Sequence, residues 1–496
     1  MKKAIALGCL LVLLFLSCSI NQLQDPSSYL EDTKTWKGVF EGFWNGMNNN
    51  YVFWEIDSPE GQWDEIYKKY APRFEEKGLV DFNDRETTKE AVLDLFEMVK
   101  GLHDGHYVLT VDTGDSISDI SFMPSAYQRV VESEGLGSLT DREILGYFYD
   151  NYKVGPAWFI ADYLNERFMP MGDGFPSIID STFGISRPYD ICPSMGAAVN
   201  AFWSSDDLGN GLSESIDKSK LHFTTTLAAG KSRTMLDAYF KQWVLIFFPL
   251  EEDGYNLTCF AGITRQTVIN GTQVPENVLY LSFSSFKFLT HMEDEHIKAF
   301  LELYQNAKRS DGTVGMIIDL RGNPGGYILD REILFADLVE TNHQYSWDRI
   351  KLGGDNRLDY SPWLPSYLYA SSNGEAKALA QKPIAVLTNS GSVSNSEHTA
   401  MLFKTFPKGV SIGGTTYGGY GALSQSYKEE NAGIFNVGDI ITLVYTPFCE
   451  TKSLDGSVRE GIGVPPNIAV EYDDADFLAG KDERLLSSFD YIKANI

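Results

Sequence analysis

From Val314 to Gly326 the chain reads VGMIIDLRGNPGG, and from Asn389 to Glu397 it reads NSGSVSNSE. The first stretch is a near-continuous apolar run, typical of a strand buried on both faces, and it ends in a glycine pair. The second is a small-residue turn that leads from a second apolar run into a helix, with Ser394 at the corner. Together they offer a nucleophile and an oxyanion site, which suggests acyl-transfer chemistry on a peptide.

A β/α pattern surrounds both stretches. The predicted strands are Val278–Phe283, Val314–Leu320, Ile384–Leu387, Val410–Gly413 and Ile440–Tyr445, and the predicted helices are Glu293–Arg309, Leu329–Val339 and Ser394–Phe406. Alternating strands and helices favour a largely parallel sheet that is covered on both sides. We therefore predict an α/β core over residues 271–496.

The chain before this core divides into two further parts. At 496 residues it is too long for one ordinary core, so we expect two or three domains. Apolar residues at helical spacing predict a mainly helical domain over residues 30–111. Residues 112–270 show no repeat and no clear periodicity, and we interpret them as a middle insert of mixed α+β class.

The N-terminus carries an export signal. Lys2 and Lys3 precede the apolar run Ala4–Leu16, which is too short for a spanning helix. Phe15-Leu16-Ser17-Cys18 resembles a bacterial lipoprotein box, which predicts a signal peptide over 1–17, lipidation at Cys18 and a tether over 18–29. An ordinary signal cleaved near Ser19 is the alternative. The serine after Cys18, in place of an aspartate, favours the outer membrane.

Charge and cysteine content exclude several classes of partner. The formal net charge is −27, and removal of residues 1–17 takes away two lysines and no acids, which gives −29. Such a field repels nucleic acid. The sparse Cys192, Cys259 and Cys449 form no disulfide framework, and no metal-binding motif is present. We expect no cofactor and no metal, and the oligomeric state cannot be deduced.

Ser394 has a catalytic interpretation and a structural one. At a helix N-terminus, free amides and the helix dipole favour the negative charge that develops during attack by serine. The amides of Gly325, Gly326 and Asn395 are the candidate oxyanion donors. Taken alone, however, Ser394 is more simply a helix N-cap, and the glycine pair a plain turn.

Three motifs in order decide between these interpretations. Asp319-Leu-Arg-x-Asn-x-Gly-Gly326, Ser392-x-Ser-x-Ser-Glu397 and Gly413-x-x-Thr-x-Gly418 resemble the tail-specific, or C-terminal-processing, serine peptidases. The similarity covers about residues 275–470, and a fainter one covers 36–110. It implies a crotonase- or ClpP-like β/α core and makes Ser394 the nucleophile.

The resemblance also implies the other catalytic residues. The lysine and glutamine of the family's Ser-Lys branch are replaced by Gly419 and Leu423. The tricorn-like branch instead uses a histidine and a glutamate, and this chain has His106 and Glu460 at those places. By that resemblance His106 is the general base and then the acid, and Glu460 supports it. Imidazole suits both proton transfers because it titrates near neutral pH.

The chain departs from the tricorn-like pattern at two positions. Gly105 stands where an accessory serine often precedes the histidine, and Asn395 replaces the common alanine after the nucleophile. His398 is a competing base, four residues after Ser394 on the same helix. Ser392 and Ser396 are competing nucleophiles.

These observations favour a lipid-anchored serine endopeptidase that cleaves peptides or proteins. The alternative is a catalytically silent surface lipoprotein that binds peptide or glycan on the same scaffold. Residues 112–270 show no glycine-rich carboxylate-binding loop of a PDZ module, which weakens any claim of selectivity for free C-termini. Since Ser394, His106 and Glu460 are all present, the sequence favours the enzyme.

Overall fold

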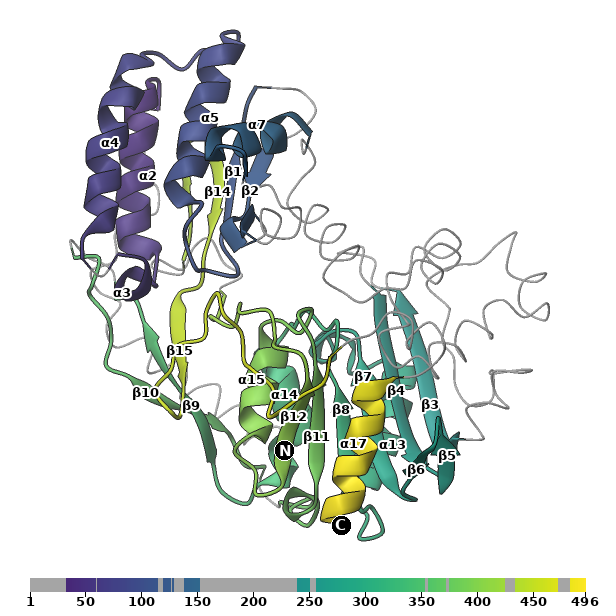
Figure 1. Ribbon diagram of the computed structural model, residues 1–496. Coiled ribbons are helices and arrows are strands. Elements are labelled where there is room, and N and C mark those ends of the chain that lie inside the picture. The colour runs from purple at the N-terminus through teal and green to yellow at the C-terminus, as the bar shows by residue number, and fades with distance from the viewer. Residues whose placement is uncertain are drawn as a thin grey trace, which may run out of the picture. The chain divides into compact units, whose positions relative to one another are not determined.

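The computed structural model describes residues 33–58, 60–114, 119–125, 127–128, 138–151, 239–249, 256–352, 356–371, 374–423, 433–471 and 482–496 (Figure 1). The chain forms two compact units. The first comprises Met1–Phe159, Arg349–Trp363 and Gly421–Glu450, and the second comprises Ile160–Asp348, Leu364–Tyr420 and Thr451–Ile496. The predicted signal and tether, Cys18, Cys192 and most of the predicted insert lie outside the described residues. Cys259 and Cys449 are buried free thiols.

Helices build most of the first unit, which agrees with a helical N-terminal region, although the helix Asp141–Asn151 belongs to the segment predicted as the insert. They are α2 (Trp36–Asn50), α3 (Trp54–Asp57), α4 (Gln62–Glu76), α5 (Arg85–Val99) and α7 (Asp141–Asn151). Aromatic side chains join α2 to α4: the Trp44 and Trp63 rings stack with centroids 4.7 Å apart. Large buried rings contribute much of the apolar burial that stabilises such a helical layer.

A four-stranded antiparallel sheet completes the first unit. Its order is β13-β14-β1-β2, from Ile434–Val437, Ile441–Tyr445, Val108–Val111 and Ile120–Phe122. Leu109 pairs with Val444 on one side and with Phe122 on the other. The predicted membership of Ile440–Tyr445 in the parallel core sheet is therefore wrong. Its half-buried pattern, with Thr442 and Leu443 partly exposed, is typical of an antiparallel strand rather than of a central parallel one.

A seven-stranded mixed sheet organises the second unit. Its order is β16-β12-β11-β8-β7-β4-β3, from Ile468–Ala469, Gly409–Gly413, Ile384–Thr388, Gly315–Asp319, Val278–Phe283, Asn256–Thr264 and Phe240–Pro249. The strands from β16 to β7 are parallel, whereas β4 and β3 are antiparallel additions. The predicted parallel core is thus correct only in part. The sheet also begins earlier than residue 271, because β3 and β4 come from the predicted insert.

Helices cover both faces of this sheet (Figure 1). They are α13 (Glu295–Arg309), α14 (Ile328–Phe335), α15 (Asn395–Phe403) and α17 (Glu483–Asn495). Alternation along β8 separates the two layers: Ile318 packs in one core with residues of α13, α14 and α15, and Ile317 packs in the other with residues of α17. A strand buried on both faces explains the continuous apolar run in the sequence.

Smaller elements complete the described residues. A three-stranded sheet has the order β10-β9-β15, from Leu364–Leu368, His343–Ile350 and Cys449–Ser453, and a hairpin joins β5 (Thr267–Ile269) to β6 (Thr272–Val274). Short 3₁₀ turns span Leu289–His291, Ala336–Leu338 and Leu379–Gln381. Among the helices of the described residues, none has the length and apolar character needed to cross a bilayer.

Candidate active site

Three neighbouring parallel strands bring the three sequence motifs of the second unit to one edge of the sheet. β11 lies between β8 and β12, and their registers align Leu387 with Asp319 and with Ile412. The carboxyl ends of parallel strands meet at the same edge, where α/β proteins commonly bind ligands. The glycine pair therefore follows β8, Ser394 follows β11, and the Gly413–Gly418 motif begins at the end of β12.

Ser394 stands at a strained corner. Its backbone angles are φ 56° and ψ −117°, whereas an ordinary N-cap residue is extended. Positive φ is uncommon for a residue with a side chain and has an energetic cost. A strained serine between a strand and a helix is the arrangement that exposes the nucleophile in other serine hydrolases. The simple N-cap interpretation of Ser394 accounts for its position but not for this backbone conformation.

Gly325 lies directly against this corner. It has φ +93°, and a Cβ built on it would stand 2.7 Å from Ser394 Cβ and 2.9 Å from Asn395 N. No side chain fits at such distances, so the backbone of the glycine pair can approach the nucleophile only because Gly325 is a glycine.

A buried carboxylate holds the corner in place. The Ser394 amide donates to Glu397 Oε2 at 3.1 Å and to the Gly419 carbonyl at 2.9 Å. Glu397 also accepts from the Gly418 and Gly419 amides, each at 2.8 Å, and from the Thr416 hydroxyl at 2.5 Å. Burial raises the pKa of Glu397, and these hydrogen bonds oppose that rise. One carboxylate thus ties the nucleophile to the loop that follows β12.

Two of the three predicted oxyanion amides are available. The Gly325 amide donates to Asn323 Oδ1 at 2.8 Å, so it is already used. Within the described ranges, the amides of Gly326 and Asn395 have no hydrogen-bond acceptor. The Ser394 amide is occupied as described above. Gly326 and Asn395 are therefore the donors that remain for an anionic oxygen at this corner.

Glu460 belongs to the same unit and is connected to the Ser394 corner through the loop over 418–420. Its side chain is buried, and its Oε2 accepts from the Tyr420 amide at 3.1 Å. Tyr420 directly follows Gly419, whose carbonyl holds the Ser394 amide. The loop over 418–420 therefore links Glu460 to the nucleophile through its backbone.

The competing residues have structural roles. The hydroxyl of Ser392 donates to the Leu320 carbonyl at 2.7 Å, and that of Ser396 donates to the Asn323 carbonyl at 2.9 Å. His398 is buried, and its Nε2 bonds the Tyr420 carbonyl at 2.7 Å. Burial, together with the nearby Arg331 charge, lowers the pKa of His398 to about 4. A neutral imidazole that donates Nε2–H to a carbonyl cannot take a proton at that nitrogen.

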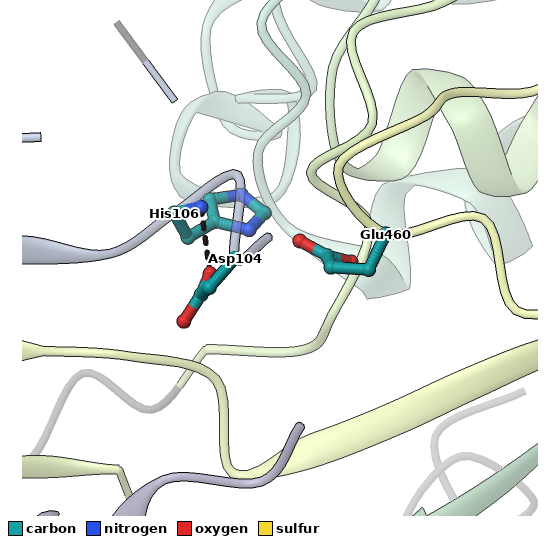
Figure 2. A group of neighbouring side chains, drawn as sticks. All are labelled: Asp104, His106 and Glu460. Atoms are coloured by element: carbon teal, nitrogen blue, oxygen red, sulfur yellow. Dashed lines mark hydrogen bonds between the residues drawn. The ribbon is translucent and has the colours of Figure 1, made fainter. Parts of the chain in front are cut away.

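His106 belongs to the first unit, where a buried carboxylate holds its loop. Figure 2 shows the bond from the His106 amide to Asp104 Oδ1, at 2.8 Å. Asp104 Oδ2 accepts from the Thr446 hydroxyl at 2.6 Å. Burial raises the pKa of Asp104 to about 7, against the effect of both hydrogen bonds. Gly105 lacks a side chain, and its carbonyl instead accepts from the hydroxyl of Ser125 at 3.5 Å.

The described residues thus gather Ser394, Gly325, Gly326, Asn395 and Glu460 in the second unit, whereas His106 lies in the first. Sequence reasoning missed the supporting carboxylates, Glu397 and Asp104. Glu397 was visible as the last residue of the serine motif, and Asp104 as the acid two residues before His106. Their burial and bonding partners come from distant segments and have no signal in the sequence.

A strained serine at a strand-to-helix corner, next to open backbone amides, is the site of a serine hydrolase. Residues 277–470 match the model of peptidase family S41. By this match over part of its length the chain is a serine-type peptidase, and the matched family implies peptide or protein substrates. No curated protein matches the chain closely enough to count as a relative.

Solved structures with similar folds include peptidases and a lipoprotein. A protein from Parabacteroides merdae, provisionally described as a peptidase, is 15% identical with a TM-score of 0.48 and covers 93% of this chain and 99% of its own. Mature CPAF in complex with lactacystin is 12% identical with a TM-score of 0.47, over 93% and 97% of the two chains. A lipoprotein from Streptococcus agalactiae is 18% identical with a TM-score of 0.32, over 45% and 68%. Similarities at this level support no functional conclusion.

Proposed function

We propose that this protein is a lipid-anchored serine endopeptidase of the tricorn-like branch, which cleaves peptides or proteins through an acyl-enzyme on Ser394. The observation that carries the proposal is the strained Ser394 backbone, packed against a glycine that no other residue can replace. Strain of this kind is retained where surrounding structure maintains it, which is common at active sites. We also propose that the core of this peptidase has a crotonase-like fold.

The proposed reaction divides peptide hydrolysis into two acyl transfers. Ser394 Oγ attacks the scissile carbonyl carbon, and His106 takes the hydroxyl proton. The carbonyl π bond becomes an oxyanion that accepts hydrogen bonds from the Gly326 and Asn395 amides. The C–N bond then breaks, and His106 returns the proton to the leaving amine. Water, deprotonated by His106, hydrolyses the ester and restores Ser394.

Glu460 supports the base in this scheme. The alternative lysine design has no counterpart here, because Gly419 stands at the lysine position and uses its backbone to hold Ser394 and Glu397. Glu460 is buried and bonds the Tyr420 amide, and in the proposed mechanism its negative charge stabilises the imidazolium that forms on His106. His106 and Glu460 are assigned these roles from the resemblance of their motifs to the tricorn-like branch.

Membrane attachment is a separate part of the proposal and rests on the sequence alone. We propose cleavage after Ser17, lipidation of Cys18 and an outer-membrane location in the bacterial envelope. Two signals are usually needed for stable anchoring, and a lipoprotein obtains them as several acyl chains on one cysteine. Metabolic labelling with a fatty-acid analogue tests this: label on the wild type that Cys18→Ser loses supports the anchor, and equal label on both refutes it.

The peptidase activity is tested by a fluorophosphonate probe on the purified full chain. We expect one labelled serine, located by mass spectrometry at Ser394 and lost in Ser394→Ala. Hydrolysis of a casein or peptide-library substrate should be lost in the same variant. A folded wild type that is neither labelled nor active would refute the peptidase assignment and favour the silent binding protein.

A further inference from the structure

The side chain of Asn395 is the feature of this site that the family pattern does not explain. It is 1% exposed and stands where alanine is common in the peptidases that the chain resembles. Its Nδ2 donates to the Tyr327 carbonyl at 2.9 Å, and its Oδ1 accepts from Arg331 Nη1 at 3.3 Å. Both polar ends of the amide are therefore satisfied, and both connect α15 to the start of α14.

This connection joins the two segments that carry the free amides. Tyr327 directly follows Gly326, and its own amide donates to the Phe286 carbonyl at 2.8 Å. Gly326 therefore sits on a segment fixed on one side by Phe286 and on the other by the Asn395 side chain. Asn395 itself carries the second amide. The Asn395 side chain thus connects the two segments that carry the free amides.

Arg331 determines which way the Asn395 amide faces. A guanidinium only donates, so it requires the carbonyl oxygen of Asn395 and leaves Nδ2 to meet the Tyr327 carbonyl. Arg331 is 3% exposed, and its Cζ lies 4.7 Å from the centre of the Tyr345 ring. In the part of the chain that the structure describes, Arg331 forms no ion pair and its Nε has no acceptor.

Arg331 is buried and has no carboxylate within salt-bridge distance in the described residues, although its charge acts through space on the Glu332 carboxylate. Its hydrogen bond to Asn395 places a fixed positive charge on the side of the α15 N-terminus. In a low-dielectric setting such a charge favours an anion that forms transiently nearby.

On the basis of the proposed function, we propose that Asn395 and Arg331 are positioning residues that fix the spacing and orientation of the Gly326 and Asn395 amides in the oxyanion hole. Because the oxyanion exists only in the transition state and the tetrahedral intermediate, this arrangement contributes to kcat and not to ground-state binding.

Asn395→Ala is the direct test, since it restores the residue common in the resembling peptidases and keeps the backbone amide. We expect kcat for peptide hydrolysis by the full chain to fall about 10- to 100-fold, with KM changed less than about 3-fold. Affinity for a peptide aldehyde, which forms a tetrahedral adduct, should fall in parallel with kcat. Asn395→Asp should lose at least as much, because its second oxygen would face the Tyr327 carbonyl.

Thr399→Val is the matched control on the same helix. The Thr399 hydroxyl donates to the Asn395 carbonyl at 2.7 Å and is equally buried, so its loss perturbs α15 without touching Tyr327 or Arg331. We expect near wild-type kcat and aldehyde affinity. Arg331→Met keeps much of the side-chain volume and should lower kcat about 10-fold; it decides the matter if Asn395→Ala does not fold.

The two proposals fail in different ways. If Asn395→Ala and Arg331→Met keep kcat and aldehyde affinity within about 3-fold of Thr399→Val, the positioning role is wrong while the peptidase stands. If the wild type shows no hydrolysis that depends on Ser394, the proposed function itself is wrong.

Discussion

The Ser394 corner of the second unit and the His106 loop of the first are both held by a buried carboxylate, but by different numbers of hydrogen bonds. In each, a buried carboxylate accepts the backbone amide of the candidate catalytic residue: Glu397 binds Ser394, and Asp104 binds His106. Glu397 accepts from three amides and a hydroxyl, whereas Asp104 accepts from the His106 amide and the Thr446 hydroxyl.

The difference lies in how many donors surround each carboxylate. Four donors around Glu397 fix a backbone conformation that serine would otherwise avoid. Asp104, with fewer donors and complete burial, has a pKa raised to about 7. Burial raises the pKa of Glu397 as well, so the two loops differ in the number of hydrogen bonds that hold them and not in which acid has a raised pKa.

Among residues outside the proposed catalytic triad, the largest effect is expected from Gly325→Ala. The added methyl group would stand 2.7 Å from Ser394 Cβ and 2.8 Å from the Val393 carbonyl oxygen, so the corner must move. A 1 Å displacement of reacting groups costs on the order of 100-fold in rate, and loss of the oxyanion geometry adds to it, so we expect about a 1,000-fold slower fluorophosphonate labelling.

Gly271→Ala is the control for that variant. Gly271 also has a positive φ, +88°, but a Cβ there meets nothing within 4 Å. It should destabilise the fold slightly and leave labelling unchanged. Equal labelling of Gly325→Ala and Gly271→Ala would show that the close packing at Ser394 has no catalytic consequence.

Glu397→Gln should have the next largest effect. Each carboxylate oxygen of Glu397 accepts from at least one backbone N–H. In a glutamine, the NH₂ group would replace one of these oxygens and would face an N–H donor that it cannot accept from. We expect kcat to fall about 100-fold with a smaller change in KM, since the ground-state contacts of substrate lie elsewhere.

Glu332→Gln is the matched carboxylate control on α14, where one oxygen accepts a single amide, that of Tyr369, at 3.0 Å. We expect little change in its kcat. A Glu397→Gln enzyme with the kcat of Glu332→Gln would contradict the role given to Glu397.

A small effect is expected from His398→Gln. The glutamine can keep the donor to the Tyr420 carbonyl, and His398 has no part in proton transfer, so we expect a change in kcat below about 5-fold. His106→Gln should lose about 1,000-fold or more in the same assay. If His398→Gln lost much more kcat than His106→Gln, His398 would be the base.

The mildest change is Asp104→Asn, which affects stability more than activity. Because folding raises the pKa of Asp104 from 3.8 to about 7, the folded state keeps a proton that the unfolded chain releases within that window. Stability must therefore fall as pH rises through it, by ~2–4 kcal/mol. Denaturant unfolding at pH 4.5 and 7.5 should show this loss in the wild type and a smaller one in Asp104→Asn; equal losses in both would contradict the raised pKa.

For the second unit, the sequence predicted the helices and strands better than it predicted which strands pair with each other. The run before Asp319 was identified as a buried central strand because it is apolar at every position, and β8 is such a strand. Ile440–Tyr445 was assigned to the same sheet because a strand pattern does not say which strand it pairs with. Only the folded chain shows that β14 joins β1, more than three hundred residues away.

Ser394, the glycine pair and Asn395 could be proposed as site residues from the sequence because their motifs are local. The sequence did not predict which amides remain free, because the bond from the Gly325 amide to Asn323 Oδ1 forms in a turn that has no recognisable sequence pattern. The supporting Glu397 and Asp104 were missed for a related reason. A buried acid is expected to be rare, and its donors, such as Thr446 for Asp104, come from remote segments.

The central claim is that His106 of the first unit activates Ser394 of the second. The most direct measurement is the rate of fluorophosphonate labelling at Ser394 in the full chain, compared between wild type and His106→Ala across pH 5 to 9. We predict that wild-type labelling rises with pH through an ionisation that His106→Ala lacks, and that His106→Ala labels at least about 100-fold more slowly. Equal labelling rates and equal pH profiles in the two proteins would contradict the account.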